Sequence, residues 1–216
     1  MIIVVILITL HDLLLSNTLS LPLVLRHRTL AQLRTSDIVA SGLEFWVPIV
    51  FSISMLIMWF LRLNVWVRRV AVVFLAWATV RLVIKVALVV NIIVSRPQSG
   101  IGVLLKDVIG MWPANFLLFG VWYWIIDGGG PDAHRDHSIQ RYDFGFPQRT
   151  VTLPRWKGWQ PRVLDYIYFG FSSSTQFGLG DTTALSIRAK LLLMLQVILS
   201  LIVIVFIASV AITLIR

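Results

Sequence analysis

Residues 166–181 read YIYFGFSSSTQFGLGD, and the interpretation of the whole chain depends on this stretch. It is aromatic and apolar at its start and rich in hydroxyl groups up to Thr175, and it is too short to cross a membrane. Gly178 and Gly180 then alternate with larger residues, which permits backbone conformations that side chains forbid. The pattern predicts a half-helix over 162–175 that dips into a membrane, followed by an extended segment that returns to the same side.

Irregular backbone at membrane depth survives only when it is buried in protein or lines a water-filled path, because unpaired carbonyls in lipid cost several kcal/mol each. A ring of such carbonyls can replace the hydration shell of a cation. An unbroken apolar stretch over 187–215 follows the glycines. Together these features predict a pore loop before a pore-lining helix. A tight turn in a helical hairpin is the alternative interpretation of Gly178 and Gly180.

The composition places the rest of the chain in a membrane. Of the 216 residues, 58% are hydrophobic and 13% are charged, whereas about a quarter of the residues in soluble domains are charged. Apolar runs long enough to cross the ~30 Å hydrocarbon core as helices lie at 2–25, 44–61, 70–94, 108–126 and 187–215. The predicted fold class is all-α integral membrane, with about five transmembrane helices and a re-entrant pore helix and filter-like loop before the last helix.

The predicted spans divide the chain into two parts. Residues 1–107 hold about three N-terminal transmembrane helices, and residues 108–216 form a pore-like module. The module consists of an outer helix (108–126), an external loop rich in Gly, Pro and charges (127–161), a pore helix and filter (162–181) and an inner helix (187–215).

The segment from Thr175 to Asp181 resembles the pore loop of the potassium-channel superfamily, whose filter reads Thr-Thr-Val-Gly-Tyr-Gly-Asp. Thr175, Gly178, Gly180 and Asp181 fall in register with that filter, and Leu179 takes the aromatic position. The resemblance implies a homotetrameric cation channel, since one loop cannot enclose an ion, with K⁺ as the transported ion and no cofactor. Asp181 would stand at the outer mouth. It could also cap the N-terminus of the last helix, and the two roles could coexist.

The implied ion-binding residues are those of the filter: Thr175, Gln176, Phe177, Gly178, Leu179, Gly180 and Asp181. Two of them depart from the channel pattern. Gln176 replaces the threonine whose hydroxyl completes the innermost site, and Phe177 is much larger than the valine packed behind the filter. The resemblance therefore implies the architecture more directly than it implies potassium selectivity.

The stretch from Phe144 to Leu201 also resembles an uncharacterised family of bacterial integral membrane proteins. The matching residues are Phe146-Pro147-Gln148, Trp159, Pro161, Asp165-Tyr166, Asp181-Thr182, Leu185-Ser186, Ala189-Lys190 and Gln196. Typical members lack the glycine pair, so they could keep a pore-loop architecture without potassium selectivity. This resemblance implies a location in the bacterial inner (plasma) membrane.

Charged residues inside predicted spans are candidates for function by default. Arg81 and Lys85 lie four apart on one face of the third span, and His11 and Asp12 interrupt the first. Structural pairing, for example with Asp12, or snorkelling is the alternative role for the two basic residues. Three hypotheses remain open: a cation channel, a non-conducting pore-loop protein with a structural or signalling role, and a proton- or cation-coupled transporter that uses these charged residues.

Other functional classes find little support in the sequence. The formal charge of +9 sits mostly beside apolar runs, so the lipid bilayer rather than nucleic acid is the expected partner. There is no cysteine and no nucleophile–base, phosphate-loop or paired-carboxylate pattern, so no enzyme and no catalytic residue is predicted. His134 and His137, with Asp132 and Asp136, have spacing that could hold a metal, but solvated loop residues are the commoner case, so no metal site is predicted.

A pore loop in the predicted order places residues 127–161 and the N-terminus outside the cell. The arginines between the second and third predicted spans would then be external, against the positive-inside rule, so the opposite orientation and a mistaken first span both stay open. Single cysteines at Ser138 and Ser36, in a chain without native cysteine, test this by labelling in intact cells. We expect Ser138→Cys to react from outside and Ser36→Cys only after permeabilisation. Labelling of Ser138→Cys only from the cytoplasm contradicts the pore loop.

Overall fold

A computed structural model describes residues 50–51, 53, 64–95, 101–127, 142–151, 153–175 and 181–215 of the chain. Several predictions fall on other residues. The span at 2–25, nearly all of the span at 44–61, filter residues 176–180 and Asp12 lie outside the described part.

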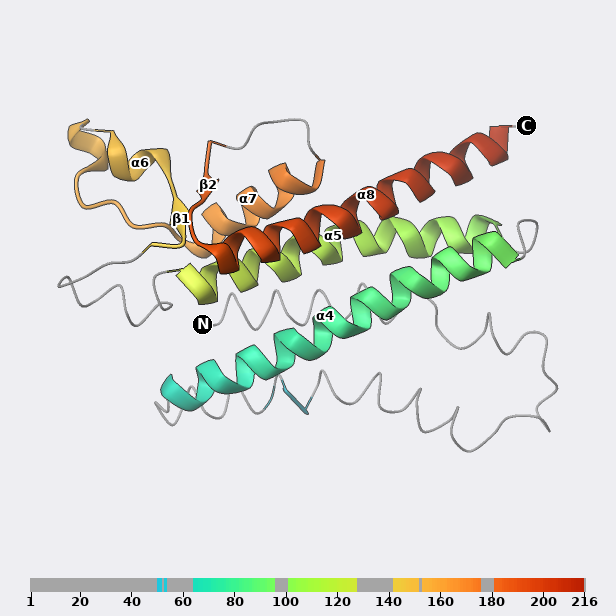
Figure 1. The fold of residues 1–216 in the computed structure, drawn as a ribbon, viewed down its shortest axis with the longest axis horizontal. Coiled ribbons are helices and arrows are strands. Elements are labelled where there is room, and N and C mark those ends of the chain that lie inside the picture. Colours follow the sequence, from blue (N-terminus) through green and yellow to red (C-terminus); the bar gives the residue numbers. More distant parts are fainter. Residues whose placement is uncertain are drawn as a thin grey trace. The chain divides into compact units, whose positions relative to one another are not determined.

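Three helices are long and apolar enough to cross a membrane. They are α4 (Asn64–Ser95), α5 (Ile101–Ile126) and α8 (Ile187–Ile215) (Figure 1). Their apolar stretches cover Arg68–Asn91, Val108–Ile126 and Ile187–Ser209. These stretches coincide with the predicted spans at 70–94, 108–126 and 187–215. The described part of the chain is therefore mostly helical with three candidate membrane spans, as the composition predicts.

The last helix begins at Ile187, but its N-cap is not the aspartate considered from the sequence. Ser186 Oγ accepts a hydrogen bond from the backbone N–H of Ala189 at 3.2 Å, which is the bond of an N-cap serine. Asp181 lies before strand β2 (Thr183–Ala184). The prediction that Asp181 caps α8 is therefore wrong.

The chain divides into two compact units. One contains α4, the first part of α5 and the end of α8, and the other is Asn115–Ile202. Within the second unit, α7 (Val163–Thr175) lies beside α5 and α8 (Figure 1). The first turn of α7 is stabilised by Asp165. Its Oδ2 accepts a hydrogen bond from the backbone N–H of Arg162 at 2.6 Å, as the third helical residue does in a capping box.

Two glycines let α7 and α5 approach closely. A Cβ at Gly170 of α7 would lie 2.8 Å from the carbonyl oxygen of Phe116, and a Cβ at Gly120 of α5 would lie 2.9 Å from Ile167 Cα. Phe116 and Phe171 pack edge to face beside this crossing, with ring centroids 5.5 Å apart. No side chain larger than hydrogen fits at either glycine without moving a helix.

Part of the predicted loop at 127–161 is ordered, which the sequence did not predict. It contains β1 (Phe144–Gly145), α6 (Pro147–Thr150) and the 3₁₀ turn Pro154–Trp156. We call the described residues between 142 and 162 the lobe. Strand β1 pairs with β2 in antiparallel register, with Phe144 opposite Ala184. The lobe is ordered because its aromatic side chains are buried: Phe144 packs against Tyr123, Tyr166 and Phe169, and Phe146 packs against Tyr166.

The close crossing of α5 and α7 predicts that a methyl group added at Gly170 lowers the stability of the protein. Gly170→Ala should lower the free energy of unfolding by about 1–3 kcal/mol, because the methyl group would overlap a backbone oxygen that cannot move alone. Thermal unfolding of the purified protein in detergent measures the effect. Leu153→Ala, at an exposed position of the lobe, is the control and should change the midpoint little. Equal midpoints for Gly170→Ala and the wild type would contradict the crossing.

Candidate functional site

The C-terminal end of α7 carries the hydroxyl groups that the sequence analysis singled out. Ser172 and Ser173 donate to the carbonyl oxygen of Phe169 at 3.0 and 2.7 Å, and Ser174 donates to Phe171 O at 2.8 Å. Thr175 Oγ1 donates to Ser172 O at 3.1 Å. Each hydroxyl therefore uses its proton within the helix, and its oxygen lone pairs remain able to accept.

Thr175 and Asp181 are the two ends of the predicted filter that the structure describes. Thr175 ends α7 and is half-buried, and Asp181 is exposed and precedes the strand that returns to the lobe. The five filter residues between them, Gln176 to Gly180, lie outside the described residues. Their role in binding an ion remains a prediction.

A fully buried glutamine joins α5, α7 and α8 within the second unit. Gln196 of α8 donates through Nε2 to Gly170 O of α7 at 2.6 Å, and its Oε1 accepts the hydroxyl of Tyr123 of α5. Asn115 Nδ2 of α5 donates to the Gln196 carbonyl oxygen at 3.3 Å and to Ser200 Oγ at 2.5 Å. These bonds, the Gln196 network, hold α7 between two candidate membrane spans. The sequence pointed to Gln196 only through the bacterial-family resemblance.

A buried aspartate at the end of α5 accepts hydrogen bonds from several parts of the chain. Asp127 Oδ1 accepts the backbone N–H groups of Asp143 and Phe144 at 2.7 and 3.2 Å. Its Oδ2 accepts the hydroxyl of Tyr166 at 2.5 Å and Nη2 of Arg149 at 3.3 Å. A fully buried carboxylate requires such partners, because removal from water penalises an unpaired charge by several kcal/mol. This Asp127 network ties the lobe and the start of α7 to the end of α5.

An ion pair holds the start of α8 near the C-terminal end of α5, where the Asp127 network lies. Arg188 donates to both oxygens of Asp143, from Nε at 2.7 Å and from Nη2 at 2.5 Å, and also to the carbonyl oxygen of Ile126 at 3.3 Å. Leu185 N–H donates to Asp143 O at 2.8 Å. The first turns of α7 and α8 therefore both lie at the C-terminal end of α5.

The acid–base state of Tyr166 follows from its surroundings. Burial raises the pKa of the Tyr166 hydroxyl well above its ordinary range, and the charge of Asp127 and the hydrogen bond to it raise it further. Tyr166 is therefore a donor to Asp127 throughout the physiological range.

The intramembrane basic residues belong to the other unit. Arg81 and Lys85 are both buried on α4, and the Arg81 guanidinium carbon lies 4.5 Å from the ring centroid of Trp77. That distance is typical of a cation–π contact. Their pairing with Asp12, and any part in transport, stay predictions because Asp12 lies outside the described residues.

The sequence analysis did not select the residues of the Asp127 network as a set. Asp127 directly follows an apolar run, which is a usable signal, but its partners Asp143 and Arg149 lie in the predicted loop and its partner Tyr166 lies 39 residues away on α7. Among the residues that the structure describes, no group of three or more His, Asp or Glu side chains could hold a metal ion. The histidines at 134 and 137 are not among them.

Comparisons of the chain with protein-family models, with curated proteins and with solved structures found no match. The two family resemblances therefore rest on the residues quoted for them.

The Tyr166–Asp127 bond predicts how stability depends on alkaline pH. An exposed tyrosine ionises near pH 10, whereas Tyr166 in the folded state keeps its proton above that pH. The folded state then binds more protons than the unfolded state, so the free energy of unfolding falls as the pH rises above about 10 and is unaffected by Tyr166 below it.

Tyr166→Phe removes this contribution, and the wild type should lose up to about 1.4 kcal/mol more per pH unit than the variant above about pH 10. Thermal unfolding in detergent at a series of alkaline pH values measures the two slopes. Leu153→Ala, which changes an exposed residue that carries no ionisable group, is the control and should keep the wild-type slope. Parallel profiles for the wild type and Tyr166→Phe would show that the hydroxyl is not buried against a carboxylate.

Proposed function

We propose that the chain is one subunit of a tetrameric cation channel in which residues 175–181 form the ion path. The observation that carries the proposal is the position of the helix starts in the second unit. Asp127 binds Tyr166 in the first turn of α7, and Arg188 in the first turn of α8 binds Asp143 and Ile126 O, so both helices start at the same end of α5.

The length of α7 determines how far the chain travels from that end. Its 13 residues span about 20 Å at 1.5 Å per residue, which is less than the ~30 Å hydrocarbon core. The residues after Thr175 must then bring the chain back to β2, which pairs with β1 in the lobe. A segment that enters partway and returns to the same side is the path of a re-entrant pore loop.

The chemistry at the end of α7 favours a cation. The C-terminus of a helix carries about half a negative elementary charge, and the hydroxyl oxygens at positions 172–175 retain free lone pairs. Gly178 and Gly180 then permit the extended backbone whose carbonyls could replace ion hydration. Gln176 and Phe177 differ from a potassium filter, so the proposal extends to monovalent cations and not to strict potassium selectivity.

The tetramer is supported by an apolar face that the single chain leaves uncovered. Leu164 and Tyr168 of α7 are 71% and 67% exposed, and Phe171 continues the same face one turn later. One loop cannot surround an ion, whereas copies arranged about a common axis could both enclose it and cover this face.

A non-conducting pore-loop protein is the alternative that the same geometry allows. The Asp127 and Gln196 networks would stabilise the module whether or not ions pass, so contacts within one chain do not separate the two functions. Conduction does.

Planar-bilayer recording of the purified protein in K⁺ and Na⁺ tests the proposal. We expect cation currents that Gly178→Ala lowers at least about tenfold, because the methyl group restricts the backbone of the filter. Gly129→Ala, a glycine of the segment between α5 and the lobe, is the matched control and should leave the current unchanged. Cross-linking in detergent should yield a tetramer.

Two results would reject the channel. The first is the absence of current from a preparation shown to be tetrameric, which would favour the scaffold. The second is a current that Gly178→Ala and Gly129→Ala leave equally unchanged, because the ions would then pass elsewhere.

A further inference from the structure

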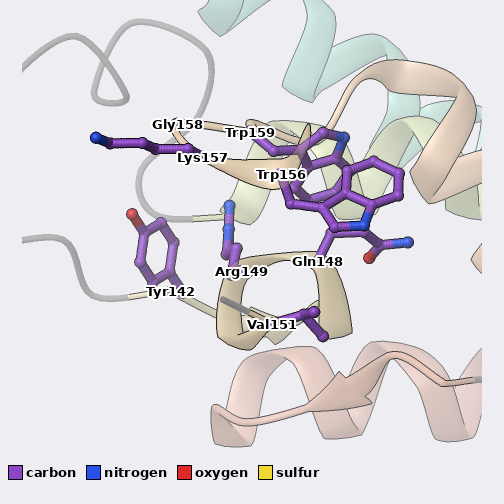
Figure 2. A pocket seen from close by; sticks show the side chains of 8 residues that line it. All are labelled: Tyr142, Gln148, Arg149, Val151, Trp156, Lys157, Gly158 and Trp159. Atoms are coloured by element: carbon purple, nitrogen blue, oxygen red, sulfur yellow. The ribbon is translucent and has the colours of Figure 1, made fainter. Parts of the chain in front are cut away.

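The lobe contains a pocket of about 300 Å³ that the proposed ion path does not use. It is lined by Tyr142, Gln148, Arg149, Val151, Trp156, Lys157, Gly158 and Trp159 (Figure 2). This volume is at the lower end of the range for small-ligand sites. A headgroup-sized ligand would fit.

Arg149 stands at the centre of the pocket lining, between Tyr142 and Trp156 in Figure 2. Its position is fixed from several sides: Nη1 donates to Phe144 O at 3.1 Å, Nη2 donates to Asp127, and the Tyr142 ring centroid lies 3.6 Å from the guanidinium carbon. Its Nε is buried and has no hydrogen-bond partner among the described residues. A guanidinium that is held in place, half-buried and left with one unused donor is suited to an oxyanion.

Two further side chains extend the polar lining. Gln148 Oε1 is also buried without a partner among the described residues, and since the two ends of an amide are interchangeable in position, the group can present N–H donors there. Lys157 is exposed and adds a second positive charge. No acidic residue is among the residues that line the pocket. Its lining therefore carries the ion-paired guanidinium of Arg149, the ammonium of Lys157 and two unused polar atoms.

The surroundings of the pocket are those of a membrane interface. Val151 is 44% and Leu153 is 53% exposed, and Trp156 and Trp159 pack edge to face beside them. Tryptophans next to exposed aliphatic and basic side chains are typical of the headgroup layer, where anionic lipids attract Lys and Arg. The lobe is also tied through Asp127 to the end of a candidate membrane span, at Ile126.

We propose that this pocket binds a phosphate-bearing anion, with Arg149 Nε, the Gln148 amide and Lys157 as its donors. The phosphate can belong to the headgroup of an anionic phospholipid or to a soluble molecule, and the two sources have the same recognition chemistry. The site does not depend on ion conduction.

Native mass spectrometry of the purified full chain tests the lipid source. Micelles contain either phosphatidylglycerol or phosphatidylcholine with matched acyl chains, and the retained lipid is measured. We expect preferential retention of phosphatidylglycerol, and we expect Lys157→Glu and Gln148→Glu each to weaken it about tenfold, the effect of losing one charge-assisted hydrogen bond. Arg162→Glu makes the same change of charge at an exposed residue outside the pocket and should alter retention less than about twofold.

A second measurement uses inorganic phosphate without lipid. Thermal stabilisation by phosphate that is lost in Lys157→Glu and kept in Arg162→Glu would identify a soluble phosphate compound as the source. Lys157 is exposed, so its variant carries the test even if Gln148→Glu fails to fold. The site is rejected if both probes bind Lys157→Glu as strongly as they bind Arg162→Glu.

Discussion

The carboxylate of Asp127 lies where a helix that could cross a membrane ends, and it is completely buried. A charge in that position is tolerated only when hydrogen-bond donors replace the lost water. The four donors lie 16 to 39 residues further along the chain: two backbone N–H groups and the guanidinium of Arg149 come from the lobe, and the hydroxyl of Tyr166 comes from α7. The paths of the lobe and of α7 both follow from this requirement.

A second constraint acts along the length of α7. Gly120 and Gly170 bring its backbone against α5 so closely that the Gln196 side chain can reach a backbone oxygen of α7 from α8. A polar side chain in an apolar helix is stabilised only by such bonds, and here each polar end of Gln196 has a partner. The glycines and the glutamine therefore work together: without the close approach, the amide would lack an acceptor.

These two sets of contacts explain how the helices are arranged, but they do not explain what the protein does. They hold a short helix beside two candidate membrane spans and return the chain to the lobe, which a pore loop needs and which a structural protein could also use. The properties of the proposed ion path would instead depend on the residues between Thr175 and Asp181 and on the proposed neighbouring copies of the chain. The pocket around Arg149 adds a chemically distinct feature, since it is basic and aromatic whereas the end of α7 carries hydroxyl oxygens.

The sequence by itself correctly predicted a mostly helical chain, the three candidate spans and the end of α7 at Thr175, because apolar length and hydroxyl-rich composition are local properties of the chain. It could not determine that Phe144 and Phe146 pack a segment rich in Gly, Pro and charges, since those rings are buried largely by partners on α5 and α7. The N-cap also depended on context: α8 begins at Ile187, after β2 has paired with β1, and Ser186 rather than Asp181 caps it.

Only the tertiary structure brought together Asp127 with Tyr166, Asp143 with Arg188, and Gln196 with Gly170. The partners in these pairs lie 39, 45 and 26 residues apart. Hydrogen bonds over such separations depend on how whole helices pack, and the periodicity of a sequence can show which face of a helix is buried but not which residue lies opposite it. The donors that a buried carboxylate or amide finds are therefore decided by the fold, although the need for donors is already evident from the residue type.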